Sequence, residues 1–237
     1  MGDANLRVKL LRCTADAELL CGTAALTTIK SGKPSDILKR MDEDNARKKI
    51  RQVTGYGHAS VIEHACFTFS LEDVSRAMTH QLVRHRIASY TQQSQRYVTY
   101  DTVEKYVVPK TIKQNAKASN LFDETLQTIS RAYNQLLRLG IPKEDARFVL
   151  PNAAKTNIIV TMNARELRHF FNLRCCVRAQ WEIREVAIEM LRQAKKVASG
   201  LFVKAGPNCV ELGYCPEGKM KPKECSVSEV RNRFLNL

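Results

Sequence analysis

Strand-like and helix-like patterns follow one another irregularly along this chain, and this order limits the fold most strongly. Residues 6–11 and 66–71 alternate apolar with polar side chains, and residues 157–162 form a β-branched run typical of a buried strand. Helical patterns fill most of the rest, especially the second half. A doubly wound sheet requires regular alternation, so we predict an α+β fold in which long helices flank a mixed or antiparallel sheet.

The positions of the helices follow from periodicity and from capping residues. Ser35 is predicted to cap one helix that runs to about Val53, and Ser60 to cap a short helix with Glu63 at capping-box spacing. The other helices are expected at residues 15–29, 75–85, 115–139, 143–148, 166–173 and 179–201, and residues 90–97 are expected to be extended. No linker divides the chain, so we expect a single domain over residues 1–237, with a cysteine-bearing tail from about residue 206.

The formal net charge of +14 limits the kinds of ligand that this chain attracts. A field of that sign attracts nucleic acids, membrane phosphates, or small anions such as nucleotides and folates. No stretch approaches the roughly 20 apolar residues of a membrane span, and the first ten residues lack an apolar signal-peptide block. We therefore expect a cytoplasmic protein that does not bind a membrane. The arrangement of the charged residues along the chain must therefore show whether the ligand is a nucleic acid or a small anion.

Familiar nucleotide and metal motifs are missing from the sequence. No G-x-G-x-x-G follows a strand, and the SGKP run at residues 31–34 lacks two residues of a phosphate loop. His58, Glu63 and His64 do not match the spacing of a zinc protease. A nucleotide bound to this chain must therefore be held by side chains.

The segment over residues 81–97 concentrates the chemistry of the chain. It holds three arginines and one histidine among hydroxyl and amide groups, with no acidic residue. Guanidinium groups match phosphate and carboxylate oxygens and stack on ring systems. In an extended segment Gln92, Ser94 and Arg96 would point to the same side and suit a nucleotide phosphate with its neighbouring groups. A solvated basic strand at the surface is the alternative, and the pattern alone does not separate the two.

The order of motifs resembles that of flavin-dependent thymidylate synthases, the thymidylate synthase-complementing protein family. Arg84-His85-Arg86, followed after seven residues by Ser94, is similar to the R-H-R-x7-S signature of that family. Upstream, residues 57–64 resemble its G-H-x-S/T-x-x-E-H stretch. Further blocks at residues 146–151, 163–167, 172–174 and 179–184 follow in the family's order. The resemblance covers residues 55–187 most closely.

This resemblance implies a homotetramer that holds FAD and dUMP where subunits meet. It assigns FAD contacts to Ser60, Arg84, His85, Arg86, Gln92, Asn163, Arg165 and His169. It assigns dUMP contacts to Gln81, Leu82, Val83, Arg84, Gln92, Gln93, Ser94, Gln95, Arg96, Arg147 and Arg174. Arg165 and His169 stand four residues apart, which places them on one face of a helix. Relatives often carry Glu at the position of Gln92 and Gly at that of Gln95, so the substrate loop departs from the family pattern there.

The resemblance also implies a reaction. NADPH reduces FAD, the reduced flavin supplies the hydride, and methylenetetrahydrofolate supplies the carbon that is added to position 5 of dUMP to give dTMP. Arg174 is the catalytic candidate, because a cation beside nitrogen 3 of uracil favours its ionisation. Ser94 is expected to bind the substrate, since no base with an orienting group is identifiable for its hydroxyl.

The eight cysteines are expected to be free thiols, as in most proteins of a reducing cytosol. Cys209, Cys215 and Cys225 stand in a tail rich in Gly and Pro, where clustered cysteines can bind zinc. They lack the C-x-x-C spacing, and a zinc site would need a fourth ligand from elsewhere in the chain. No metal site is therefore predicted.

Two rival functions stay open at this point. The high charge also fits a nucleic-acid-binding protein, although the sequence offers no recognised binding module or basic tail. A flavoprotein reductase of unrelated substrate would share only the cofactor set and would not respond to dUMP. Neither rival explains why the basic and polar residues fall in ordered, family-like blocks.

Overall fold

The computed structural model describes residues 7–100, 102 and 105–237 and contains a four-stranded sheet. Its strands β1 (Arg7–Cys13), β2 (Cys66–Ser75), β3 (Ala88–Gln92) and β4 (Lys155–Asn163) lie in the order β1-β2-β4-β3. The Oγ1 atoms of Thr68 and Thr161 are 2.9 Å apart, and the Asp73 N–H donates to Asn157 Oδ1. Positions rise along β2 as they fall along β4, so these strands are antiparallel. The predicted α+β fold is confirmed. Leu6, which begins the first predicted strand, lies outside the described residues.

The helices lie close to their predicted positions. They are α1 (Ala17–Thr27), α2 (Pro34–Lys39), α3 (Glu43–Gly55), α4 (Arg76–Leu82), α5 (Lys110–Lys113), α6 (Ala116–Arg138), α7 (Lys143–Ala146), α8 (Ala164–Arg174), α9 (Trp181–Val197), α10 (Asn208–Leu212) and α11 (Val227–Leu235). Short 3-10 helices are η1 (Ala59–Ile62), η3 (Arg147–Val149), η4 (Ser199–Leu201) and η5 (Gly218–Met220). Within the described residues, no helix has both the length and the apolar character that crossing a membrane requires.

Two details of the predicted helices are wrong near the N-terminus. The helix expected over residues 35–53 is two helices, because Asp42 starts α3 by accepting the Asn45 N–H on its side chain at 2.8 Å. Ser35 does not cap α2, which begins at Pro34. Ser60 lies inside η1 and caps nothing.

Two other helices end earlier than predicted. The helix expected over residues 179–201 ends at Val197, because Ala198 leaves the helical conformation with a φ of −153°. The helix expected over residues 75–85 ends at Leu82, after Ser75 has capped it by accepting the Met78 N–H. The Arg84-His85-Arg86 motif therefore follows α4 and precedes β3.

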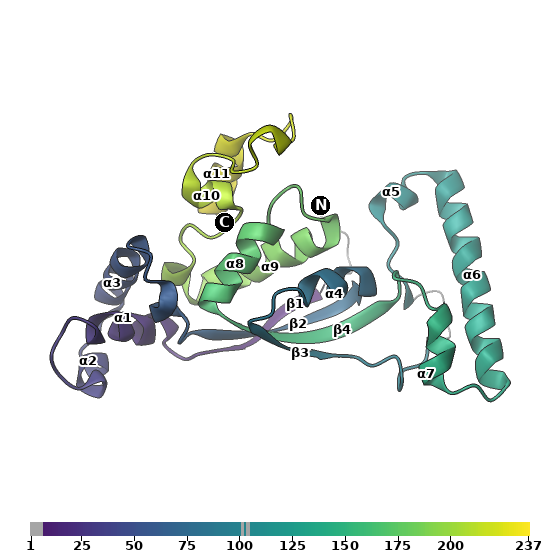
Figure 1. Cartoon of the computed structure of the whole chain (residues 1–237), viewed down its shortest axis with the longest axis horizontal. Coiled ribbons are helices and arrows are strands. Elements are labelled where there is room, and N and C mark those ends of the chain that lie inside the picture. The colour runs from purple at the N-terminus through teal and green to yellow at the C-terminus, as the bar shows by residue number, and fades with distance from the viewer. Residues whose placement is uncertain (1–6, 101, 103–104) are drawn as a thin grey trace. The chain divides into compact units, whose positions relative to one another are not determined.

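The chain divides into two compact units, and each is discontinuous in sequence. Unit 1 includes Leu71–Arg84 and Thr91–Ile158, and unit 2 comprises Val8–Ser70, His85–Tyr90 and Ile159–Leu237. In unit 1, the long helix α6 (teal in Figure 1) directs Leu126 and Tyr133, seven residues apart, into one core. That core also contains Tyr100, Tyr106, Ala146 and Ala154.

Unit 2 has an aromatic core beneath its helices. The ring of Phe202 lies 5.3 Å from that of Phe67 on β2 and 5.9 Å from that of Phe171 on α8, both edge-on. Helices α8 and α9 pack against each other in this unit (Figure 1). This packing fixes α8, and α8 carries several of the predicted site residues.

Candidate active site

Two predicted site residues, His85 and Arg174, meet in unit 2. Arg174 ends α8 and donates its Nε–H to Nε2 of His85 at 3.1 Å. Because Nε2 accepts this bond, the imidazole is neutral and carries its proton on Nδ1. His85 is only 4% exposed, and this burial, together with the charge of Arg174, lowers its pKa to about 4. The pair is therefore a neutral acceptor that holds a guanidinium in place at pH 7.

Glu166 and Tyr90, two residues outside the predicted site set, lie beside His85. The Nδ1 atom of His85 lies 3.5 Å from Oε1 of Glu166, beyond a good hydrogen bond. Glu166 is itself buried, and that burial raises the pKa of its carboxyl. The hydroxyl of Tyr90 donates to the backbone oxygen of His85 at 2.7 Å. Glu166 lies in the family-like block at residues 163–167, and Tyr90 lies between Arg86 and Ser94 of the signature. These positions are the features of the sequence that could have pointed to the two residues.

Helix α8 also carries three of the predicted FAD residues. Asn163 caps it by accepting the Glu166 N–H on Oδ1 at 2.9 Å. Arg165 and His169 are exposed one turn apart, so the predicted shared helix face exists. Arg165 pairs with Glu63 at 2.6 Å, and the His169 ring lies edge-on to His85 at 5.6 Å.

The remaining FAD residues are spread over both units. Ser60 and Arg86 are exposed on unit 2, whereas Arg84 is exposed on unit 1. Gln92, in unit 1, is half-buried. Guanidinium, imidazole, hydroxyl and amide groups are the donors that a pyrophosphate and the polar edge of a flavin require. The chemistry of this set therefore fits FAD, with no need for a Gly-rich loop.

The prediction that residues 90–97 form one extended segment is wrong beyond Gln92. Strand β3 ends there, and a turn follows in which the Ser94 hydroxyl oxygen accepts the Arg96 N–H at 3.1 Å. This local hydroxyl-to-backbone bond competes with strand pairing. Gln92 instead donates its amide to the hydroxyls of Thr79 and Thr156 at 3.0 and 3.3 Å. Gln92, Ser94 and Arg96 therefore do not share a strand face.

Two of the predicted dUMP residues, Arg96 and Arg147, gather around Glu144 in unit 1. Arg96 bonds Oε2 of Glu144 through Nε at 2.8 Å and through Nη2 at 2.7 Å. Arg147 donates its Nε–H to the backbone oxygen of Glu144 at 3.0 Å. Both guanidinium groups are therefore anchored on Glu144, and its carboxylate pairs with the charge of Arg96.

The three predicted dUMP residues at positions 81–83 differ in their exposure to solvent. Gln81 is half-buried and Val83 is exposed, whereas the side chain of Leu82 is fully buried. Leu82 as a whole is 0% exposed, so the predicted substrate contact at this residue is not accessible in this structure.

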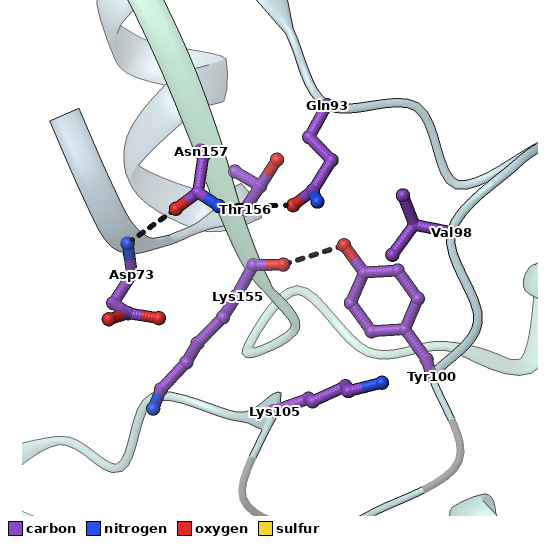
Figure 2. A pocket seen from close by; sticks show the side chains of 8 residues that line it. All are labelled: Asp73, Gln93, Val98, Tyr100, Lys105, Lys155, Thr156 and Asn157. Atoms are coloured by element: carbon purple, nitrogen blue, oxygen red, sulfur yellow. Dashed lines mark hydrogen bonds between the residues drawn. The ribbon is translucent and has the colours of Figure 1, made fainter. Parts of the chain in front are cut away.

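A pocket of about 210 Å³ lies in unit 1 beside the substrate loop (Figure 2). Figure 2 shows Gln93, Asn157 and Asp73 joined by hydrogen bonds, with Asn157 donating to Gln93 and accepting the Asp73 N–H. The lining residues are Asp73, Gln93, Val98, Tyr100, Lys105, Lys155, Thr156 and Asn157. Gln93 alone among them belongs to the predicted set, so the structure does not bring the predicted dUMP residues together in this pocket.

Comparison with known proteins identifies the relatives of the chain. Residues 9–198 match the family model described as thymidylate synthase complementing protein. The chain belongs to this family. A relative from Geobacter sulfurreducens is 50% identical over 234 residues, which cover 98% of this chain and 99% of that protein. Relatives from Pyrococcus abyssi and Pyrococcus furiosus are 43% and 44% identical, and the matches cover 98% and 93% of both chains, respectively.

Each of these relatives is named flavin-dependent thymidylate synthase. The resemblance found in the sequence is therefore confirmed, and with it the prediction of an enzyme. For a thymidylate synthase complementing protein, the structure adds that the three motif residues differ in their surroundings. Arg84 and Arg86 are exposed, while His85 is buried against Arg174.

Proposed function

We propose that this chain converts dUMP to dTMP, with methylenetetrahydrofolate as carbon donor, FAD as cofactor and NADPH as the source of electrons. The names of its relatives support the flavin and the product. The observation that carries the proposal is the buried, neutral His85 that holds the guanidinium of Arg174. A guanidinium held in place in this way can stabilise the charge that develops on a reacting ring, because it does not first have to reorient.

Arg174 is the residue proposed to activate the substrate. Burial lowers its pKa, but a guanidinium keeps its proton in proteins. Placed beside nitrogen 3 of uracil, it stabilises the negative charge that develops on the ring as position 5 becomes nucleophilic. His85 orients the guanidinium through its Nε2 acceptor, and Tyr90 anchors the backbone of His85.

The other predicted residues are proposed to bind and orient. Arg84, Arg86, Arg165 and His169 would hold the phosphates of FAD, whose flavin supplies the hydride when reduced. In unit 1, Arg96 and Arg147 would hold the phosphate of dUMP, with Ser94 beside them. The turn at Ser94 ties the serine hydroxyl oxygen to the backbone, which supports binding rather than nucleophilic attack by this residue.

The proposed assembly is a cytoplasmic homotetramer with shared active sites. Phe148 is 82% exposed, and Tyr97 of the substrate loop is 73% exposed. Aromatic side chains are enriched in interfaces between protein chains relative to the rest of the surface. Both lie in unit 1 near Arg147 and Arg96 in sequence, which favours an interface beside the substrate residues.

The visible absorption spectrum of the purified protein, before and after addition of dUMP, tests this function. We expect a flavin spectrum that dUMP perturbs, because both ligands would share one site. A flavin spectrum indifferent to dUMP would favour an unrelated reductase. A protein that takes up no FAD and instead binds DNA with a steep salt dependence would replace the proposal with the nucleic-acid alternative.

A further inference from the structure

Two buried threonines hold the side-chain amide of Gln92, the last residue of β3. Thr79 on α4 and Thr156 on β4 are each 1% exposed, and their hydroxyl oxygens accept from Nε2 of Gln92 at 3.0 and 3.3 Å. All three residues belong to unit 1. Gln92 is in the predicted site set, whereas neither threonine is. Because both threonines are buried, any effect of their hydroxyls on a ligand passes through Gln92.

The hydroxyl of Thr79 determines which end of the amide faces it. This hydroxyl donates its one proton to the backbone oxygen of Arg76, three residues earlier in α4, at 3.1 Å. Toward Gln92, the Thr79 oxygen is therefore an acceptor. A reversed amide would bring the carbonyl oxygen of Gln92 against an oxygen that has no proton to share. The contact therefore favours the observed orientation, with Nε2 of Gln92 toward Thr79.

This orientation leaves one polar atom of the Gln92 side chain to a ligand. The amide has two N–H hydrogens, and Thr79 and Thr156 can accept one each. Its carbonyl oxygen, Oε1, is uncharged and only accepts hydrogen bonds. Gln92 is half-buried, so part of the residue stays accessible. The side chain therefore suits a hydroxyl or an N–H of a ligand and does not suit the oxygens of an ionised phosphate.

The backbone beside Gln92 is held as well. The N–H of Gln93 donates to the backbone oxygen of Asn157 at 2.8 Å, and the backbone oxygen of Gln93 accepts from Nη2 of Arg76 at 2.9 Å. A side chain held both at its amide and beside its backbone loses little freedom when it binds a ligand. The acceptor at Gln92 is therefore oriented before the ligand arrives.

We propose that Thr79 and Thr156 are positioning residues for substrate binding, which turn Gln92 so that its carbonyl oxygen accepts a hydrogen bond from a hydroxyl or N–H of dUMP. The inference rests on the proposed function, because it takes dUMP as the ligand. FAD also carries hydroxyl and N–H groups. The position of Gln92 favours dUMP, since Gln92 shares unit 1 with Ser94, Arg96 and Arg147 of the predicted dUMP set.

Calorimetric titration of the full-length, FAD-loaded protein with dUMP tests the proposal. We expect Thr79→Val to raise the dissociation constant for dUMP about 3- to 10-fold, the worth of one neutral hydrogen bond. Thr79→Ser, which keeps the hydroxyl, should restore the affinity. The matched control is Thr161→Val, which removes a hydroxyl that contacts Thr68 in unit 2 and should leave dUMP affinity unchanged. Thr156→Val provides the same measurement if Thr79→Val does not fold.

A double-mutant cycle tests whether Thr79 acts through Gln92. In a Gln92→Ala background, Thr79→Val should cause no further loss of dUMP affinity. An equal loss in both backgrounds, or an equal loss in Thr161→Val, would overturn the proposal, because a general structural effect would then explain it. Weaker FAD binding with unchanged dUMP affinity would overturn the choice of ligand. A protein that binds no dUMP at all would contradict the proposed function itself, an outcome distinct from the others.

Discussion

At the scale of single residues, the contact between Arg174 and His85 carries the proposed chemistry. Replacing Arg174 with Ala removes the cation but leaves the exposed residues assigned to FAD untouched. We expect normal flavin binding and a loss of turnover of about 100-fold or more, the size found when an electrostatic group is removed from an active site. Flavin absorbance and the rate of dTMP formation measure the two effects. Unchanged turnover would remove Arg174 from the mechanism.

The burial of His85 predicts a dependence of stability on pH. Its pKa is about 4 in the folded protein and 6.5 in the unfolded chain, so the unfolded chain binds more protons between these values. The contribution to stability is complete above pH 6.5 and is lost as the pH falls toward 4, by up to about 3 kcal/mol. Urea unfolding between pH 7 and pH 4.5 measures it. His85→Gln, which cannot titrate, should show a shallower slope, and an equal slope would contradict this account.

At the scale of elements, the start of α8 sets the position of three predicted FAD residues. Asn163 accepts the Glu166 N–H, and a capping side chain is worth about 1 kcal/mol. We expect Asn163→Ala to lower the free energy of unfolding by that amount, and Asn163→Asp to keep it, because a carboxylate caps equally well. Chemical denaturation of both variants without flavin measures the effect. If both variants are equally destabilised, the cap is not the cause.

How far the sequence predicts these elements depends on which interactions form them. Alternation and β-branching are local signals, so the sequence predicts the strands at residues 66–71 and 157–162, and β2 and β4 contain them. The sequence does not predict the break at Asp42 or the turn after Gln92, because single side-chain hydrogen bonds produce them. The burial of His85 against Arg174 joins residues 89 positions apart, and periodicity does not reveal such a contact.

At the scale of the whole molecule, the exposed apolar side chains predict association. Phe148 and Tyr97 would be covered in the proposed homotetramer. We expect sedimentation velocity to show a tetramer, and Phe148→Ser to shift the population toward smaller species without unfolding the chain. A monomer at micromolar concentration in the unsubstituted protein would contradict the proposed assembly, although the family assignment would stand.

Chromatography of the nucleotides after incubation tests whether this protein synthesises dTMP from dUMP. The reaction contains the purified protein, FAD, NADPH, methylenetetrahydrofolate and dUMP, with each component omitted in turn. We expect dTMP in the complete mixture and none when any one component is left out, apart from FAD if it copurifies. Oxidation of NADPH by the flavin with no dTMP in the complete mixture would contradict the proposed function and would favour a reductase with another substrate.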